Sequence, residues 1–295
     1  MMVERTTYDR VRERRVSHRV EAKTTAGQVE PQRGKPQDLV LAFLGSVVLD
    51  RFDDRPVPTR VFLNLLGRLG VSDVAARATL SRMAQRGLLA RRRVGRETAF
   101  TLTDRSREVL REGEDRILSH TPFDHAGDVW TLLAFSLPES RRDVRHRLRT
   151  RLSWAGFGPL RDGLWIAPGT VDVTALLRDL PEIADDEAVG AFSAVPRPPA
   201  RVDAMIRKAW ALPQLRAAHE EFLRRWEGTE PEPETLPQLA RLLADWIRLL
   251  RTDPGLPAAH LAADWPAARS TAAFHGLHDR IESPAIAEFA ALLDP

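Results

Sequence analysis

Seven arginines stand close together in one short part of the 295-residue sequence, and their setting suggests binding rather than catalysis. Between Ser72 and Arg96 they are opposed by one acid, Asp73, which leaves a formal excess of six positive charges. Guanidinium groups hydrogen-bond phosphate oxygens and guanine edges, so a field of this sign suits DNA. Charge runs are also common on solvated loops, so the two interpretations are separated by the elements that position the arginines.

Apolar residues at helical spacing predict three helices before and within this stretch. Asp38, Thr59 and Ser72 are placed as their N-caps, and Gly70 and Gly87 are placed to end the second and third. The third helix has a narrow apolar stripe, formed by Ala76, Leu80 and Met83. Burying this stripe turns the basic and hydroxylated residues of the same helix outward.

The segments Leu88 to Arg93 and Glu97 to Leu102 alternate around "VGR" and predict a β-hairpin, followed by a helix from Thr103 to about Gly113. Three helices and a hairpin are the winged form of the helix-turn-helix, whose third helix enters the major groove of DNA. We therefore expect DNA contacts from Ser72, Arg77, Ala78, Ser81 and Arg82 on the third helix, and from Arg92, Arg93 and Arg96 on the wing.

Alternation along the first wing strand predicts that its arginines do not share one role. If Leu89, Phe100 and Leu102 face the core, Arg91 lies on the same face of the hairpin, and its aliphatic stem covers the core. The other wing arginines are then the better candidates for phosphate contacts.

The remaining sequence predicts two more regions, so the fold class is α+β. A βαββαβ order over residues 128–198 predicts a ferredoxin-like central domain, and residues 199–295 are helical in pattern. A basic flexible tail is expected over 1–37, a winged helix domain over 38–113 and a linker over 114–127.

Composition removes several classes of protein. The chain has no cysteine, which excludes disulfides, thiolate catalysis and cysteine-ligated zinc. It has no long apolar run and no secretory signal, so we expect a cytoplasmic protein without membrane contact.

The "GFGPLRDG" stretch, residues 156–163, follows a helix and precedes a strand, which is the wrong context for a phosphate loop. His275 and His278 lack a third ligand, so no metal and no cofactor are expected.

Three stretches in this order resemble the phenylacetic acid catabolon repressor family, PaaX. They are "VSDVAARATLSRMAQRGLLARRRVGRETAFTLT", "GDVWTLLAFSLPESRRDVRHRLRTRLSWAGFGPLRDGLWIAP" and "LRTDPGLPAAHLAADWP". The resemblance runs from about Asp38 to Ile281 and implies a homodimeric repressor with a winged helix, a ferredoxin-like domain and a helical C-terminal domain. It also implies a partly palindromic operator and release from DNA by an effector such as an aryl acyl-CoA thioester.

The C-terminal region is the expected place for effector binding and dimerisation, because ligand sites favour boundaries between domains. The candidate effector residues are Trp210, Trp226, Trp246, Arg248 and Arg251. Two alternatives to a regulator stay open: an enzyme on the same scaffold, either a metal-dependent nuclease or a thioester hydrolase, or a protein-binding scaffold. The central region also resembles a small CRISPR adaptation nuclease, but Ser136 stands where that enzyme carries a metal-binding acid. We therefore expect no enzyme.

Overall fold

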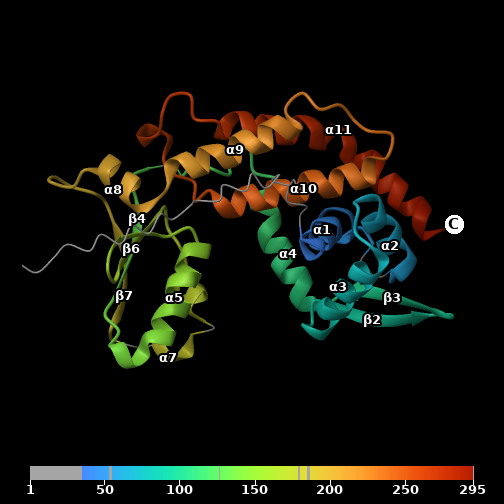
Figure 1. Ribbon diagram of the computed structural model, residues 1–295, viewed down its shortest axis with the longest axis horizontal. Helices are drawn as coiled ribbons and strands as arrows, with labels where there is room; N and C mark the ends of the chain where they lie inside the picture. Colours follow the sequence, from blue (N-terminus) through green and yellow to red (C-terminus); the bar gives the residue numbers. More distant parts are fainter. Residues whose placement is uncertain (1–34, 53–54, 126, 179, 185–186, 295) are drawn as a thin grey trace, which may run out of the picture. The chain divides into compact units, whose positions relative to one another are not determined.

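The computed structural model describes residues 35–52, 55–125, 127–178, 180–184 and 187–294. The basic tail expected over 1–37 falls almost wholly outside these residues. The described residues belong to one compact unit, and none of their helices is long and apolar enough to cross a membrane. Its N-terminal part contains α1 (Pro36–Phe43), η1 (Leu44–Val48), β1 (Val57–Pro58), α2 (Thr59–Arg68), α3 (Asp73–Gln85), β2 (Leu89–Val94), β3 (Glu97–Leu102) and α4 (Asp104–Ile117) (Figure 1).

The predicted order of three helices, a hairpin and a fourth helix is confirmed, but two of the three predicted caps are wrong. Ser72 does cap α3, since its side chain accepts from the backbone N–H of Ala75. Asp38 lies inside the first turn of α1, because Pro36 occupies the first turn and starts the helix earlier. Thr59 is the first residue of α2, and its hydroxyl donates instead to the carbonyl of Thr98 at 2.6 Å.

Three local features of this part differ from the prediction. The segment Val57–Pro58 forms β1 and pairs with β3, giving the strand order β1-β3-β2 in place of a lone hairpin. The first helix continues into a π-helical turn, η1, which the apolar spacing does not signal. Helix α4 extends to Ile117, so the boundary expected between residues 113 and 114 falls inside a helix.

The central part confirms the βαββαβ order, with the second helix split in two. It contains β4 (Trp130–Phe135), η2 (Glu139–Arg141), α5 (Arg142–Trp154), β5 (Gly158–Arg161), β6 (Leu164–Pro168), α6 (Val173–Leu177), α7 (Pro181–Ala184) and β7 (Val189–Ala194). The antiparallel sheet has the order β5-β6-β4-β7, which places the first and third strands of the unit side by side. One face of the sheet buries Trp130 and Ile166 against Ile206 and Leu215 of the C-terminal region.

The C-terminal part is helical, as predicted. It contains α8 (Val202–Ala209), α9 (Leu212–Trp226), α10 (Thr235–Thr252), η3 (Ala258–His260) and α11 (Ala267–Leu293), and α10 packs against both α9 and α11 (Figure 1). Pro213 lies in the first turn of α9, where a proline is tolerated. Pro284 lies inside α11 without ending it.

The N-terminal and C-terminal parts share one hydrophobic core. Buried residues of α1, α2, α3 and the hairpin belong to the same cluster as those of α10 and α11. One of the contacts joins Phe43 and Phe289, whose ring centroids are 5.2 Å apart in an edge-to-face arrangement. Helices α1 and α2 pack directly on α10, and α3 packs on α1 and α2, so the elements that carry the arginines are joined to the C-terminal helices through this core.

Candidate nucleic-acid interface

Helix α3 buries one stripe and exposes a basic face, as its sequence predicts. Ala76, Leu80 and Met83 are at most 1% exposed. Arg77 and Arg82 are exposed, while Ala78 and Ser81 are half-buried at the base of the same face. The small residues between the two arginines would let this helix approach a groove closely.

The two guanidinium groups of this face are not committed to ion pairs. Arg77 has no side-chain hydrogen bond or ion pair to another described residue, and Arg82 contacts only the hydroxyl of Thr79, at 3.2 Å. Many arginines elsewhere in the described chain meet a carboxylate, as Arg225 meets Asp245 at 2.7 Å. The side chains of this face therefore keep their donors available for a ligand.

Sequence reasoning missed one residue of the same face. Val74 is 80% exposed, one turn before Arg77. Val74 lies three residues before Arg77 on the same capped helix, and this spacing was enough to predict that both side chains share one face. It was overlooked because apolar residues are usually assigned to the core. An exposed apolar side chain here suits the methyl group of thymine.

In the hairpin, Arg91 lies on the face that strand alternation predicts. Arg91 lies opposite Phe100 and its guanidinium carbon is 5.9 Å from the ring centroid, so it covers the core face. Arg92 and Arg96 have no side-chain hydrogen bond or ion pair to another described residue. Arg93 donates to the carbonyl of Gly95, the turn glycine with φ of +59°.

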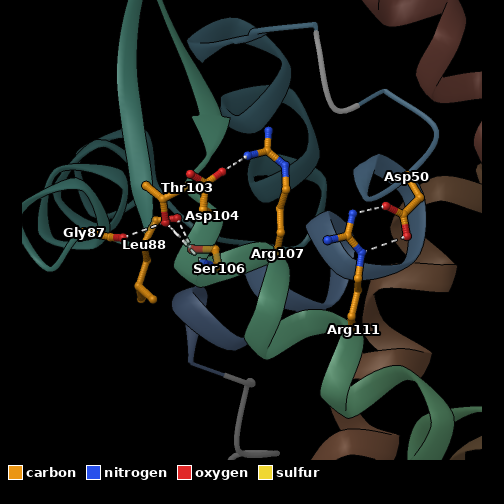
Figure 2. A network of polar contacts seen from close by, with 8 residues as sticks. All are labelled: Asp50, Gly87, Leu88, Thr103, Asp104, Ser106, Arg107 and Arg111. Atoms are coloured by element: carbon orange, nitrogen blue, oxygen red, sulfur yellow. Dashed lines mark hydrogen bonds and ion pairs between the residues drawn. The ribbon is translucent and has the colours of Figure 1, made fainter.

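A polar network joins α3, the hairpin and α4 (Figure 2). The hydroxyl of Thr103 donates to the carbonyl of Gly87 at 2.8 Å and accepts from the N–H of Ser106. The hydroxyl of Ser106 donates to the carbonyl of Leu88. The cap of α4 thus holds the turn that follows α3, which fixes the helix and the wing relative to each other.

An ion pair attaches α4 to the end of η1 (Figure 2). Arg111 contacts both oxygens of Asp50, a residue with φ of +59° in the turn that follows η1. The hydrogen bond from Arg111 lowers the pKa of the Asp50 carboxyl. The pair is exposed, so it orients the loop more than it stabilises the fold.

Comparisons with known proteins agree across the chain. A family model described as PaaX-like protein matches residues 35–106, one described as PaaX protein central Cas2-like domain matches 124–200, and one described as PaaX-like protein C-terminal domain matches 210–291. The chain belongs to the PaaX family. The predicted family membership is thereby confirmed.

Two relatives of this PaaX-family chain carry different kinds of information. Transcriptional repressor PaaX of Escherichia coli (strain K12) is 27% identical over 239 residues, which cover 76% of this chain and 73% of the relative. The prediction that the chain is not an enzyme agrees with that relative. The solved structure of uncharacterized protein Rv0674 from Mycobacterium tuberculosis has a TM-score of 0.57 at 24% identity and covers 88% of this chain and 99% of that chain. This likeness shows the fold alone.

None of the cavities formed by the described residues brings together the five candidate effector residues of this PaaX-family chain. The three tryptophan N–H groups are used within the fold: Trp210 donates to Gly156 O at 3.2 Å, Trp226 to Asp245 at 3.1 Å and Trp246 to Ile117 O at 2.9 Å. Among the candidates, only Arg251 lines the cavity of about 440 Å³ that α1, η1 and α4 form with α10 and α11.

The two arginine candidates are also paired. Arg248 meets Asp245 at 3.1 Å, and Arg251 meets Asp38 at 3.3 Å. Asp245 gathers Arg225, Arg248 and Trp226, so this cluster ties α9 to α10. These residues act as packing and pairing groups in the fold, and their proposed contact with an effector stays a prediction.

The structure also brings a serine, a histidine and an aspartate together, which spacing in the PaaX-family sequence does not reveal. His219 Nδ1 is 2.9 Å from Ser270 Oγ, and His219 Nε2 is 2.7 Å from Asp253 Oδ2. The three residues are at most 3% exposed. A nucleophilic serine must reach a substrate carbonyl, which a fully buried hydroxyl does not, so the arrangement ties α9, α10 and α11 together.

His275 and His278 of α11 occupy different environments. His275 Nε2 is 3.1 Å from the carbonyl of Ser119, and its ring stacks on His120 at 4.1 Å. His278 is 4% exposed. Among the residues that the structure describes, no group of three or more histidine, aspartate or glutamate side chains could hold a metal ion.

Proposed function

We propose that this chain is a DNA-binding transcriptional repressor whose residues 38–113 form a winged helix-turn-helix. Helix α3 enters the major groove, and the hairpin β2–β3 is the wing that contacts backbone phosphates. The observation that carries the proposal is the exposed face of α3, on which Arg77 and Arg82 project without acidic partners. The name of the curated relative, a transcriptional repressor, supports the same function.

The proposal includes a homodimer, a partly palindromic operator and a small-molecule effector such as an aryl acyl-CoA. Two copies of α3 would read successive major grooves, and the effector would favour a spacing of the two helices that the operator does not match. Residues 128–198 would be the ferredoxin-like central domain and residues 199–295 the helical effector and dimerisation domain.

Selection of random double-stranded DNA by the purified full chain tests the proposal. We expect enrichment of a sequence with two related half-sites, bound in a gel shift with a Kd in the range of about 10⁻⁸–10⁻¹¹ M at physiological salt. A pool that does not change composition over the selection rounds would contradict DNA recognition.

The wing arginines predict the salt dependence of this binding. Changing Arg92 and Arg96 together to alanine should reduce the slope of log K against log salt by about 0.9 for each lost phosphate contact. Arg91→Ala is the control, because Arg91 lies over Phe100; it removes one charge from the same hairpin, against two in the double variant, so the change in slope is compared per charge removed. Equal slopes for the double variant and the wild type would remove the wing from the interface.

The edge strand β7 offers a surface for the proposed homodimer. It pairs with β4 on one side only, and Phe192 at its middle is 60% exposed. If two copies of β7 pair antiparallel about Phe192, Glu187 of one copy faces Arg197 of the other, because both lie five residues from the centre. Unpaired edge strands with this pattern are templates for pairing.

Phe192→Arg should therefore convert the dimer to a monomer, because two like charges would meet at the centre of the new strand pair. Size-exclusion chromatography with light scattering measures the mass. Trp154→Arg is the control, since Trp154 on α5 is 83% exposed and is not in β7. A dimer that survives Phe192→Arg would place the interface elsewhere.

A further inference from the structure

Val74 places an exposed apolar side chain on the face of α3 that otherwise carries basic and small residues. It is 80% exposed, and among the large apolar side chains that the structure describes only Trp154 is more exposed. It belongs to none of the hydrophobic clusters formed by the described residues. A single exposed apolar residue needs no explanation on an ordinary surface, so the meaning of Val74 depends on its place on the helix.

Val74 lies in the first turn of α3, on the side of the helix that faces away from the core. Side chains three and four residues apart share one face of a helix, so Val74 lies beside Arg77 and Ala78. The buried stripe, which includes Ala76 and Leu80, lies on another side of the same helix. In a helix-turn-helix the N-terminal residues of the recognition helix contact base edges. Val74 is therefore placed where α3 would come closest to the bases.

Ala78 extends the apolar surface of Val74 by one helical turn. The two residues are four apart, a spacing that brings their Cβ atoms to about 5–6 Å on a helix. Ala78 is half-buried, so its methyl group lies lower on the face than the exposed side chain of Val74. The pair forms a small apolar surface beside Arg77, of a size to cover a methyl group.

The charges around this apolar surface select its partner. Arg77 and Arg82 are exposed on the same helix, and neither meets a carboxylate among the described residues. A surface with this charge attracts a polyanion. In the major groove of DNA, the apolar group that base pairs present is the C5 methyl group of thymine. A thymine therefore satisfies both the charge and the apolar surface of α3.

Distances along α3 place this thymine relative to the guanine expected at Arg77. Val74 and Arg77 are three residues apart, which is about 4.5 Å along the axis of a helix. Successive bases of one strand are about 3.4 Å apart along the axis of DNA. A helix lying in the groove would therefore bring the two side chains to bases that are about one or two steps apart.

We propose that Val74, together with Ala78, contacts the methyl group of one thymine in each half-site, close to the guanine that Arg77 contacts. Val74 is then a specificity-determining residue, because it favours one base without adding charge to the interface. The free energy comes from removing the methyl group and the valine side chain from water. This inference rests on the proposed function, since it requires that α3 enter the major groove.

Uracil in place of thymine tests the contact, because uracil keeps the base pair and removes only the methyl group. Each thymine of the selected half-site is replaced in turn, at the equivalent position of both half-sites, and binding of the full chain is measured in a gel shift. We expect one position at which the replacement weakens binding about fifteenfold, or about fourfold for each methyl group.

Val74→Ala should weaken binding to the thymine duplex, and the uracil replacement should then have little further effect. Loss of one partner removes the value of the other, so the two changes are coupled when the groups are in contact. A methyl group that acted only through the flexibility of DNA would have the same effect on wild type and variant. The thermal unfolding midpoint of Val74→Ala should equal that of the wild type, because the side chain is exposed.

Val109→Ala is the matched control. Val109 lies on α4 and is 55% exposed, so the substitution removes the same two methyl groups from a surface outside the α3 face. This variant should bind the thymine and uracil duplexes as the wild type does. Selection of random DNA gives a second measurement: Val74→Ala should reduce the preference for the coupled thymine and keep the guanine, whereas Arg77→Ala should do the reverse.

Two results would overturn the thymine contact while the proposed function stands. One is DNA selected and bound by the wild type without a thymine that is sensitive to uracil. The other is independent effects, in which uracil weakens binding of wild type and Val74→Ala by the same factor. If the wild type selects no DNA at all, the proposed function fails and the thymine contact fails with it.

Discussion

Changing Arg77 and Arg82 together to alanine should abolish retention of operator DNA in a gel shift while leaving the thermal unfolding midpoint unchanged. Both side chains are exposed on α3, and neither has an acidic partner, so their removal disrupts no ion pair. Each lost contact to a guanine edge costs about 1–3 kcal/mol, so the two together should cost about 2–6 kcal/mol of binding free energy. Even the lower value weakens binding roughly thirtyfold.

Loss of positive charge alone must be separated from loss of a specific contact. The double variant Arg207→Ala with Arg224→Ala removes the same charge from exposed positions on α8 and α9, and it should retain the operator. Binding of the Arg77 and Arg82 double variant at wild-type affinity would show that α3 is not the recognition helix. Equal loss in both double variants would mean that only the overall field attracts DNA.

The sequence predicts the DNA-reading face well because its determinants are local. A cap at Ser72, a buried stripe three and four residues apart and a glycine with positive φ at Gly87 fix both the ends and the rotation of α3. Strand alternation similarly separates Arg91 from its neighbours on β2. The exposed arginines follow from these local rules, although their contact with DNA stays a prediction.

The cavity and its polar groups could not be predicted because they depend on contacts between distant segments. The pattern identifies Trp226 and Trp246 as large aromatic residues of a helical region, but their N–H partners come from Asp245 and from Ile117 of α4. The spacing of His275 and His278 shows only that they lie one turn apart on α11, whereas His275 contacts Ser119 and His120, which are distant in the sequence. The π-helical turn has no periodic signal of its own.

The core shared by the N-terminal and C-terminal parts could not be predicted from the sequence for the same reason. Apolar stripes on α1 and α10 each show that one face is buried, but they do not show that the two faces are buried against each other. A region expected to be an independent domain therefore packs on the region expected to bind the effector. This packing makes a mechanical route from the C-terminal helices to α3 available without a flexible linker.

The buried aspartate at the end of α10 predicts the largest effect on folding. Asp253 is 3% exposed, and its carboxylate accepts from the backbone N–H of Gly255 at 2.7 Å and lies 2.7 Å from Nε2 of His219. A carboxylate only accepts, so His219 donates to it and receives the hydroxyl hydrogen of Ser270 at its other nitrogen. The ring of His219, wholly buried, rests edge-on against Phe123 at 4.8 Å.

Asp253→Ala should lower the free energy of unfolding by about 2–6 kcal/mol, because two buried N–H groups lose their acceptor at a cost of about 1–3 kcal/mol each. The variant leaves the imidazole of His219 and the N–H of Gly255 in the core without acceptors, and water cannot replace the carboxylate there. Urea unfolding followed by circular dichroism measures the change. Asp264→Ala is the matched control: Asp264 meets Arg216 at 2.8 Å but is 79% exposed, so water takes over its role and stability should hardly change. If both variants unfold at the wild-type urea concentration, the buried histidine does not need its carboxylate, and the junction of α9, α10 and α11 is held by apolar packing alone.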